Sequence, residues 1–167
     1  GADMVIYSGA KAVEGPTSGF ITGKRIYIEK CKAQYKGVGR AAKIGKECMM
    51  GIAKAVELYA RRDEEKEAAR QKQIVDELVE GLSKLNYLKV SVKADDAGRK
   101  IYRAKVDVIP GVSKLTAKEI VKQLQSGTPA VYTRNHFVDQ GTILIDPRTM
   151  LPGDAALIIQ RFQELGR

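Results

Sequence analysis

The protein has 167 residues, of which 44% are hydrophobic and 29% charged, a composition typical of a folded globular chain and unlike that of disordered or fibrous proteins. No run approaches the roughly 18 consecutive apolar residues of a membrane-spanning helix, and the N-terminus lacks a signal-peptide pattern, so we expect a cytoplasmic protein without a membrane partner. A formal net charge of +9 is compatible with nucleic acid, with small anions such as phosphates and carboxylates, or with a solvated basic surface alone. Cys31 and Cys48 lack the short spacing of metal or redox motifs, so we expect two free thiols and no metal site.

The first predicted elements are two short strands joined by a glycine-rich turn. Residues 2–7 form a continuous apolar run that predicts a buried strand, and residues 20–22 predict a second strand. Lys11 lies between them, just beyond the end of the first strand. Open α/β sheets commonly bind ligands at strand ends, and a lysine amine with a lowered pKa is a nucleophile toward carbonyl groups. Lys11 is therefore a candidate functional residue.

Helical patterns follow the second strand. Residues 24–34 give a weak helical pattern that is broken by glycines at 37 and 39, whereas residues 41–61 carry apolar side chains at clear helical spacing. A charged stretch and a further apolar face predict another helix within residues 62–85. We expect a domain boundary within or near the helix at 41–61.

The hydrophobic period then changes from 3.6 to 2. Residues 88–94 and 102–108 each alternate apolar and polar side chains, which predicts two strands with one buried face, joined as an antiparallel hairpin. In the second strand Arg103, Lys105 and Asp107 occupy the alternate positions.

The last third of the chain predicts a mixture of helices and strands. Thr116-Ala117-Lys118-Glu119 has the capping-box pattern that opens a helix. Residues 130–133 and 142–145 predict two more strands, and Pro152-Gly153-Asp154 introduces a final helix. This part of the chain therefore reads as helices packed on a largely antiparallel sheet.

Three separated blocks carry a family resemblance. They are Ser8-Gly9-Ala10-Lys11 with Gly15-Pro16 and Gly19; Gly39-Arg40-Ala41-Ala42-Lys43; and Pro129-Ala130-Val131-Tyr132-Thr133-Arg134 with Ile145-Asp146-Pro147-Arg148-Thr149. Together they resemble the bacterial selenocysteine synthase (seryl-tRNA selenium transferase) group. The sequence around Lys11 looks closer to the related D-glucosaminate-6-phosphate ammonia lyases. Selenocysteine synthases more often have an acidic residue before the lysine and Gly-Pro-Gln after it, and this chain departs from both features.

The resemblance implies an α/β and α+β fold, the C-terminal part of the aspartate-aminotransferase-like fold (fold type I). On that analogy residues 1–40 end the large cofactor-binding domain, residues 41–62 form a connecting helix, and residues 63–167 form a small α+β domain. The chain begins at Gly1, without an initiator methionine, and enters an apolar segment almost at once. We therefore expect it to be part of a longer protein.

The resemblance also implies a pyridoxal 5'-phosphate site. Lys11 would form the Schiff base with the cofactor. Ser8 would donate a hydrogen bond to the cofactor phosphate, although a hydroxyl that serves only the local turn is an equal alternative. Thr17 and Ser18 are further phosphate-binding candidates, because they lie in a turn rich in backbone amides.

Three basic residues are implied to bind the substrate. Arg134 would hold a carboxylate through its fork of N–H groups, unless it is a surface arginine at a strand end. Arg40 and Lys43, one helical turn apart, would hold a second anion such as a phosphate, or would only keep the helix soluble. We assign the single histidine, His136, to turn or packing, and we expect Asp146 and Arg148 to pair or cap locally.

The implied activity is release of ammonia from a phosphorylated amino-sugar acid, with Lys11 removing the α-proton before β-elimination. The alternatives are selenium transfer on seryl-tRNA and, from a different class, a non-catalytic basic nucleic-acid-binding module. The module is disfavoured because three Phe and no Trp offer few stacking surfaces. Residues for the pyridine nitrogen and ring would lie upstream, so we expect this chain alone to be inactive and the intact enzyme to be a homodimer or larger assembly.

Overall fold

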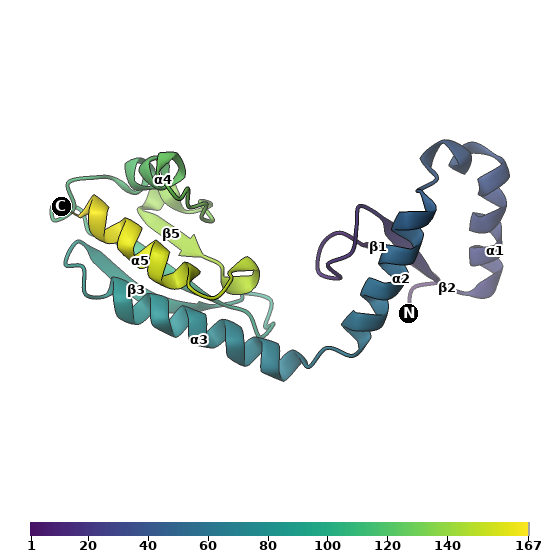
Figure 1. The fold of residues 1–167 in the computed structure, drawn as a ribbon, viewed down its shortest axis with the longest axis horizontal. Coiled ribbons are helices and arrows are strands. Elements are labelled where there is room, and N and C mark those ends of the chain that lie inside the picture. Colours follow the sequence, from purple (N-terminus) through teal and green to yellow (C-terminus); the bar gives the residue numbers. More distant parts are fainter. Residues whose placement is uncertain (167) are drawn as a thin grey trace. The chain divides into compact units, whose positions relative to one another are not determined.

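The computed structural model describes residues 1–166 and divides into two compact units, which meet in sequence at Asp63 and Glu64 (Figure 1). Among the described helices, none is both long enough and apolar enough to span a bilayer.

The first unit begins with a two-stranded antiparallel sheet. Strands β1 (Met4–Ser8) and β2 (Gly19–Gly23) pair so that Ser8 lies opposite Gly19, and the loop between them carries Lys11. Tyr7 and Phe20, which are also opposite each other, stack with ring centroids 4.8 Å apart. Both predicted strands are therefore confirmed.

The expected burial of β1 is wrong. All five of its residues are exposed, and Ile6 has 72% of its surface accessible. The reason is that β1 pairs only with β2 in this unit, and a two-stranded sheet leaves most of its side chains in solvent when no further layer covers it.

Helices complete the first unit. Helix α1 (Arg25–Ala33) confirms the weak prediction for residues 24–34, and two short 3₁₀ helices, Gln34–Lys36 and Val38–Ala42, follow it. Helix α2 (Lys46–Ala60) begins later than the prediction of 41–61, because Gly45 is its N-cap and has an extended backbone.

The second unit is built on a three-stranded antiparallel sheet in the order β3-β4-β5. Strands β3 (Leu88–Ala94) and β4 (Tyr102–Val108) form the predicted hairpin, with Val90 opposite Val106. Strand β5 (Thr142–Ile145) pairs with β4 so that Ala104 lies opposite Ile145. This register decides which side chains meet at the end of β5.

Three helices pack against this sheet. They are α3 (Glu64–Leu82), α4 (Ala117–Ser126) and α5 (Asp154–Leu165), and α3 and α5 lie side by side in Figure 1. The predicted capping box is present, because the Thr116 hydroxyl accepts from the Glu119 N–H while the Glu119 carboxylate accepts from the Thr116 N–H. Helices and sheet share one core, whose fully buried members include Leu78, Leu82, Val106, Ile120, Leu124, Ile143 and Phe162.

The predicted strand at 130–133 is wrong. These residues have no regular secondary structure, and only Arg134 forms an isolated antiparallel bridge with Leu144. The Arg134 N–H donates to the Leu144 carbonyl at 2.9 Å, and the Leu144 N–H donates back at 3.1 Å. Residues 130–133 have no strand beside them with which to pair, so no ladder forms. The single bridge still fixes the backbone of Arg134 to β5.

Candidate active site

Lys11 lies in the loop that joins β1 to β2, three residues beyond the end of β1, and its side chain is exposed. The loop is held by backbone hydrogen bonds: the Gly9 N–H donates to the Ser18 carbonyl at 2.9 Å, and the Gly15 N–H donates to the Gly9 carbonyl at 2.8 Å. The Glu14 N–H donates to the Lys11 carbonyl at 2.9 Å. The backbone on which Lys11 sits is therefore ordered, while its amine remains accessible.

Helix α2 supports this loop through two close approaches. Pro16 lies against Gly51 so closely that a Cβ added to Gly51 would meet the Pro16 Cγ at 2.8 Å. Gly9 also lies close to α2, since a Cβ added to it would meet the Ile52 Cδ1 at 2.6 Å and would also collide with the Ser18 Oγ. Ile52 is buried, and it is the only large buried side chain described in the first unit. The glycines thus allow the loop to rest directly on α2.

The hydroxyl groups predicted to bind a phosphate share this loop with Lys11 but are not equally available. The Ser18 hydroxyl donates to the Pro16 carbonyl at 2.7 Å, so it is engaged in the turn. Ser8 and Thr17 are exposed, and within residues 1–166 neither hydroxyl makes a hydrogen bond. Ser8 and Thr17 therefore have the free donors that a phosphate oxygen requires.

Arg40 and Lys43 are not placed on an α-helix as expected. Arg40 lies in the 3₁₀ helix Val38–Ala42, and Lys43 is its C-cap, with an extended backbone. The two remain linked, since the Lys43 N–H donates to the Arg40 carbonyl at 3.3 Å. Both side chains are exposed, and in the described chain neither forms an ion pair.

Arg134, Asp146 and Arg148 come together at the end of β5. Arg134 is 38% exposed, and its Nη1 donates to the Asp146 Oδ2 at 3.1 Å. Arg148 forks onto the same carboxylate, with Nε 2.9 Å from Oδ1 and Nη2 2.9 Å from Oδ2, and its backbone N–H also donates to Oδ1. The predicted local pairing and capping by Asp146 and Arg148 is confirmed, and Arg134 joins it.

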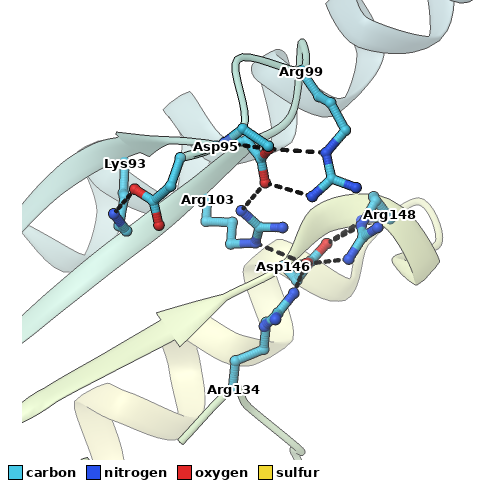
Figure 2. Close-up of polar contacts among 9 residues, drawn as sticks. Lys93, Asp95, Arg99, Arg103, Arg134, Asp146 and Arg148 are labelled. Atoms are coloured by element: carbon cyan, nitrogen blue, oxygen red, sulfur yellow. Dashed lines mark hydrogen bonds and ion pairs between the residues drawn. The ribbon is translucent and has the colours of Figure 1, made fainter. Parts of the chain in front are cut away.

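A third arginine, which the sequence pattern did not single out, completes this cluster. Arg103 on β4 donates from Nε to the Asp146 Oδ2 at 3.0 Å and from Nη1 to the Asp95 Oδ1 at 3.3 Å. Figure 2 shows the Asp146 carboxylate lying among the guanidinium groups of Arg103, Arg134 and Arg148. We call Asp95, Arg99, Arg103, Arg134, Asp146 and Arg148 the arginine–aspartate cluster.

The cluster perturbs the pKa values of its acids. Burial raises the pKa of Asp146, but hydrogen bonds from Arg148, Arg103 and Arg134 outweigh it, so the pKa lies well below its usual range. A hydrogen bond from Arg99 is the main cause that holds the pKa of Asp95 below its usual range. Arg99, Arg103, Arg134 and Arg148 therefore contact two ionised carboxylates, which leaves the cluster with a formal excess of positive charge.

Sequence reasoning missed Arg103 because it occupies the polar face of an alternating strand. Its side chain is only 7% exposed, whereas an alternating pattern places such a residue in solvent. The sequence feature that could have revealed this contact is an arginine in the central strand, together with Asp95 directly after β3 and Asp146 directly after β5. Buried arginines need such partners.

His136 lies in an exposed turn after Arg134 and makes no side-chain hydrogen bond within residues 1–166. Both cysteines are free thiols, as predicted.

The Lys11 loop suits a phosphorylated aldehyde such as pyridoxal phosphate. It offers one accessible primary amine, two hydroxyls that have no partner among residues 1–166, and a backbone fixed by hydrogen bonds and by α2. An amine forms the covalent bond to the aldehyde, and hydroxyl and amide donors hold phosphate oxygens.

Comparison with known proteins shows a set of relatives that match 99% of the chain. The chain is 43% identical over 165 residues to "D-glucosaminate-6-phosphate ammonia lyase" of Salmonella typhimurium, an alignment that covers 99% of this chain and 44% of that protein. It is 37% identical to "5'-C-glycyluridine monooxygenase-decarboxylase" of a Streptomyces species, with 99% and 41% covered, and 26% identical to an "L-seryl-tRNA(Sec) selenium transferase" of Aquifex aeolicus, with 99% and 39% covered. The chain thus spans less than half the length of these relatives.

A solved structure agrees with the sequence relationships. "Structure of D-Glucosaminate-6-phosphate Ammonia-lyase" superposes with a TM-score of 0.85 and 43% identity, over 99% of this chain and 44% of that one. The expected fold class, part of the aspartate-aminotransferase-like fold, is therefore confirmed. The family model described as "SelA: L-seryl-tRNA selenium transferase" matches residues 1–139, and the chain belongs to this family.

Proposed function

We propose that the protein releases ammonia from a phosphorylated amino-sugar acid of the D-glucosaminate-6-phosphate type, with pyridoxal 5'-phosphate as cofactor. The main support is the 43% identity to the ammonia lyase over 99% of this chain, which includes the Lys11 loop and the segment around Arg134. The selenium transferase of Aquifex aeolicus is more distant, at 26% identity.

Lys11 is proposed as the residue that binds the cofactor and moves the proton. Its amine would hold the cofactor through a covalent bond to the aldehyde carbon. The neutral Lys11 amine would then be the base that removes the proton from the α-carbon of the substrate. The bound cofactor supplies an electron sink for the charge that this step leaves on the α-carbon. Ser8 and Thr17 are proposed to donate to the cofactor phosphate, and Ser18 to support the turn.

The rest of the reaction follows from the chemistry of the substrate. The β-hydroxyl leaves with a proton as water, and hydrolysis of the resulting enamine gives a 2-keto acid and ammonia. Lys11 would gain the α-proton and return a proton to the departing hydroxyl. Loss of water followed by hydrolysis changes no net oxidation state, so no external oxidant or reductant is needed.

The two anionic ends of such a substrate have separate proposed partners. Arg134 would bind the carboxylate, because its guanidinium is partly exposed and only its Nη1 donates to Asp146. Arg40 and Lys43 would bind the phosphate, because both are exposed cations without an ion pair in the described part of the chain.

Borohydride trapping tests the role of Lys11. The holoenzyme should show a visible absorbance band with pyridoxal phosphate, and reduction should fix the cofactor to the peptide that contains Lys11, as seen by mass spectrometry. Lys11→Ala should abolish both the trapped adduct and ammonia release. The matched control is Lys36→Ala, a lysine in the 3₁₀ helix Gln34–Lys36, which should leave both unchanged. An adduct that survives Lys11→Ala excludes the proposed role.

Substrate choice needs its own assay. Ammonia release from D-glucosaminate-6-phosphate should exceed turnover of seryl-tRNA with a selenium donor and of a glycyl-uridine nucleoside, the chemistries named by the two other relatives. Strong, salt-sensitive tRNA binding by the holoenzyme would instead favour selenium transfer. We also propose that the holoenzyme is a homodimer or larger, which sedimentation would test.

A further inference from the structure

We propose that Asp146 is a positioning residue for the substrate carboxylate: it holds the Arg134 guanidinium so that the rest of its donors face the ligand. This inference rests on the proposed function, in which Arg134 binds the carboxylate of an amino-sugar acid. It adds a residue that would not itself touch the substrate.

The first support is that hydrogen bonds hold both the backbone and the guanidinium group of Arg134. Its backbone is paired with Leu144 of β5 through two hydrogen bonds, of 2.9 and 3.1 Å. Its Nη1 donates to the Asp146 Oδ2 at 3.1 Å. An arginine fixed at its backbone and at the tip of its side chain loses little further rotamer freedom when a ligand binds.

The second support is the set of donors that remains. Within residues 1–166 the Arg134 side chain makes no hydrogen bond other than the one from Nη1 to Asp146. Its Nη2 and Nε therefore keep their N–H groups, and these two nitrogens form an edge that matches a carboxylate in two parallel bonds. The side chain is 38% exposed, so it is not enclosed by the protein.

The third support is that Asp146 itself is held in place. It is 16% exposed, and besides Arg134 it accepts from Arg103 on β4 and from both the side chain and the backbone of Arg148. These contacts come from β4 and from the segment after β5, so the carboxylate cannot follow Arg134 if that side chain moves. The depressed pKa of Asp146 keeps the carboxylate charged at neutral pH.

Charge and position predict opposite effects, which makes the inference testable. Asp146→Asn removes a negative charge beside three guanidinium groups, so on charge alone the variant should bind an anion more tightly. If Asp146 positions Arg134, the variant should bind a carboxylate more weakly, by about tenfold, the size of one lost charge-assisted hydrogen bond.

The experiment compares two ligands in the holoenzyme. D-glucosaminate-6-phosphate carries the carboxylate, and D-glucosamine-6-phosphate has the same phosphate and amine without it. We expect Asp146→Asn to raise KM for the first, while Ki for the second as a competitive inhibitor stays the same. Asp107→Asn is the matched control: Asp107 also accepts two side-chain hydrogen bonds on the same sheet, from Lys105 and Thr142, but it lies outside the arginine–aspartate cluster, so it should change neither constant.

A double-mutant cycle shows whether Asp146 acts through Arg134. Arg134→Ala alone should raise KM for the carboxylate ligand, and adding Asp146→Asn to it should cause no further rise. Calorimetric titration in the Lys11→Ala background, where proton removal is blocked, should give the same pattern for Kd without turnover.

Asp146→Glu covers the case in which Asp146→Asn does not fold. Glutamate keeps the charge but displaces the carboxylate by one methylene group, so it should still weaken binding of the carboxylate ligand. Unchanged or tighter binding in either folded variant overturns the inference, as does an equal loss for both ligands. If Arg134→Ala leaves KM unchanged, the proposed carboxylate site itself is wrong.

Discussion

Arg103 on β4 donates from Nε to the Oδ2 of Asp146 at 3.0 Å, which ties the central strand of the sheet to the segment that follows β5. The same guanidinium reaches Asp95 at the end of β3 with Nη1, 3.3 Å from Oδ1. One buried side chain on the central strand therefore connects the segments that follow its two neighbouring strands in the sheet, and several measurable properties depend on it.

Removal of Arg103 should destabilise the second unit. Arg103→Met leaves Asp146 and Asp95 without a shared partner, although Arg134, Arg148 and Arg99 still neutralise them. We expect a loss of about 2–3 kcal/mol in the free energy of unfolding, the cost of breaking a buried charged hydrogen bond. Urea denaturation followed by circular dichroism measures it. Arg103→Lys should lose less, since its ammonium can still reach one carboxylate.

Acid should weaken the second unit through the same two aspartates. Their pKa values in the folded state lie below the ordinary value of 3.8, so folding favours the ionised form. The stabilisation is present above that value and is lost as the pH falls through it toward the lower folded-state pKa values. We expect a flat urea midpoint at neutral to mildly acidic pH and a steep fall below about pH 4. In Asp146→Asn the fall should be shallower; an equally steep curve would show that other acids dominate.

Tyr87 should titrate late. Its hydroxyl donates to the Phe162 carbonyl at 2.5 Å, and burial raises the pKa of its phenol to about 12. Because the folded-state pKa is raised, the stabilisation is complete below the ordinary value of 10.0 and is lost as the pH rises from there toward 12. In a pH titration followed by tyrosinate absorbance, the Tyr87→Phe variant should have one fewer phenol that ionises near pH 12 than the unmodified protein. At neutral pH this variant should lose about 1 kcal/mol of stability.

Gly51 should control the Lys11 loop. A methyl group in Gly51→Ala would lie 2.8 Å from the Pro16 Cγ, so the loop or α2 must move to admit it. We expect less borohydride-trapped pyridoxal phosphate at Lys11, with the second unit equally stable. Gly37→Ala is the control, because its methyl group would meet its nearest atom at an ordinary 3.5 Å. Equal trapping in both variants would mean that the loop does not depend on its contact with α2.

Local patterns predicted most of the elements correctly, because the interactions behind them lie within a few residues. The capping box at Thr116 and Glu119 joins residues three positions apart, and the change of period at residue 88 marks the start of β3. The prediction for residues 130–133 failed because a strand requires a partner along its length, and only Arg134 has one.

Burial was less predictable than secondary structure. The apolar run at Met4–Ser8 reads as a buried strand, but burial depends on what covers the sheet, and in its own unit β1 has only β2 beside it. Arg103 shows the converse error. Its place on the polar face of an alternating strand predicts exposure, but the side chain is buried and bonded to Asp95 and Asp146, which the local pattern does not connect with it.

By itself, the sequence determined the Lys11 loop with its strand, glycines and hydroxyls, since all of these lie within a dozen residues of one another. It also determined that Asp146 and Arg148 pair, since two positions separate them. Only the tertiary structure decided that Arg103, which is 43 positions from Asp146 in the chain, donates to the same Asp146 carboxylate as Arg134. That meeting depends on the register in which β4 pairs with β5, and a shift of one residue would turn Arg103 to the other face of the sheet.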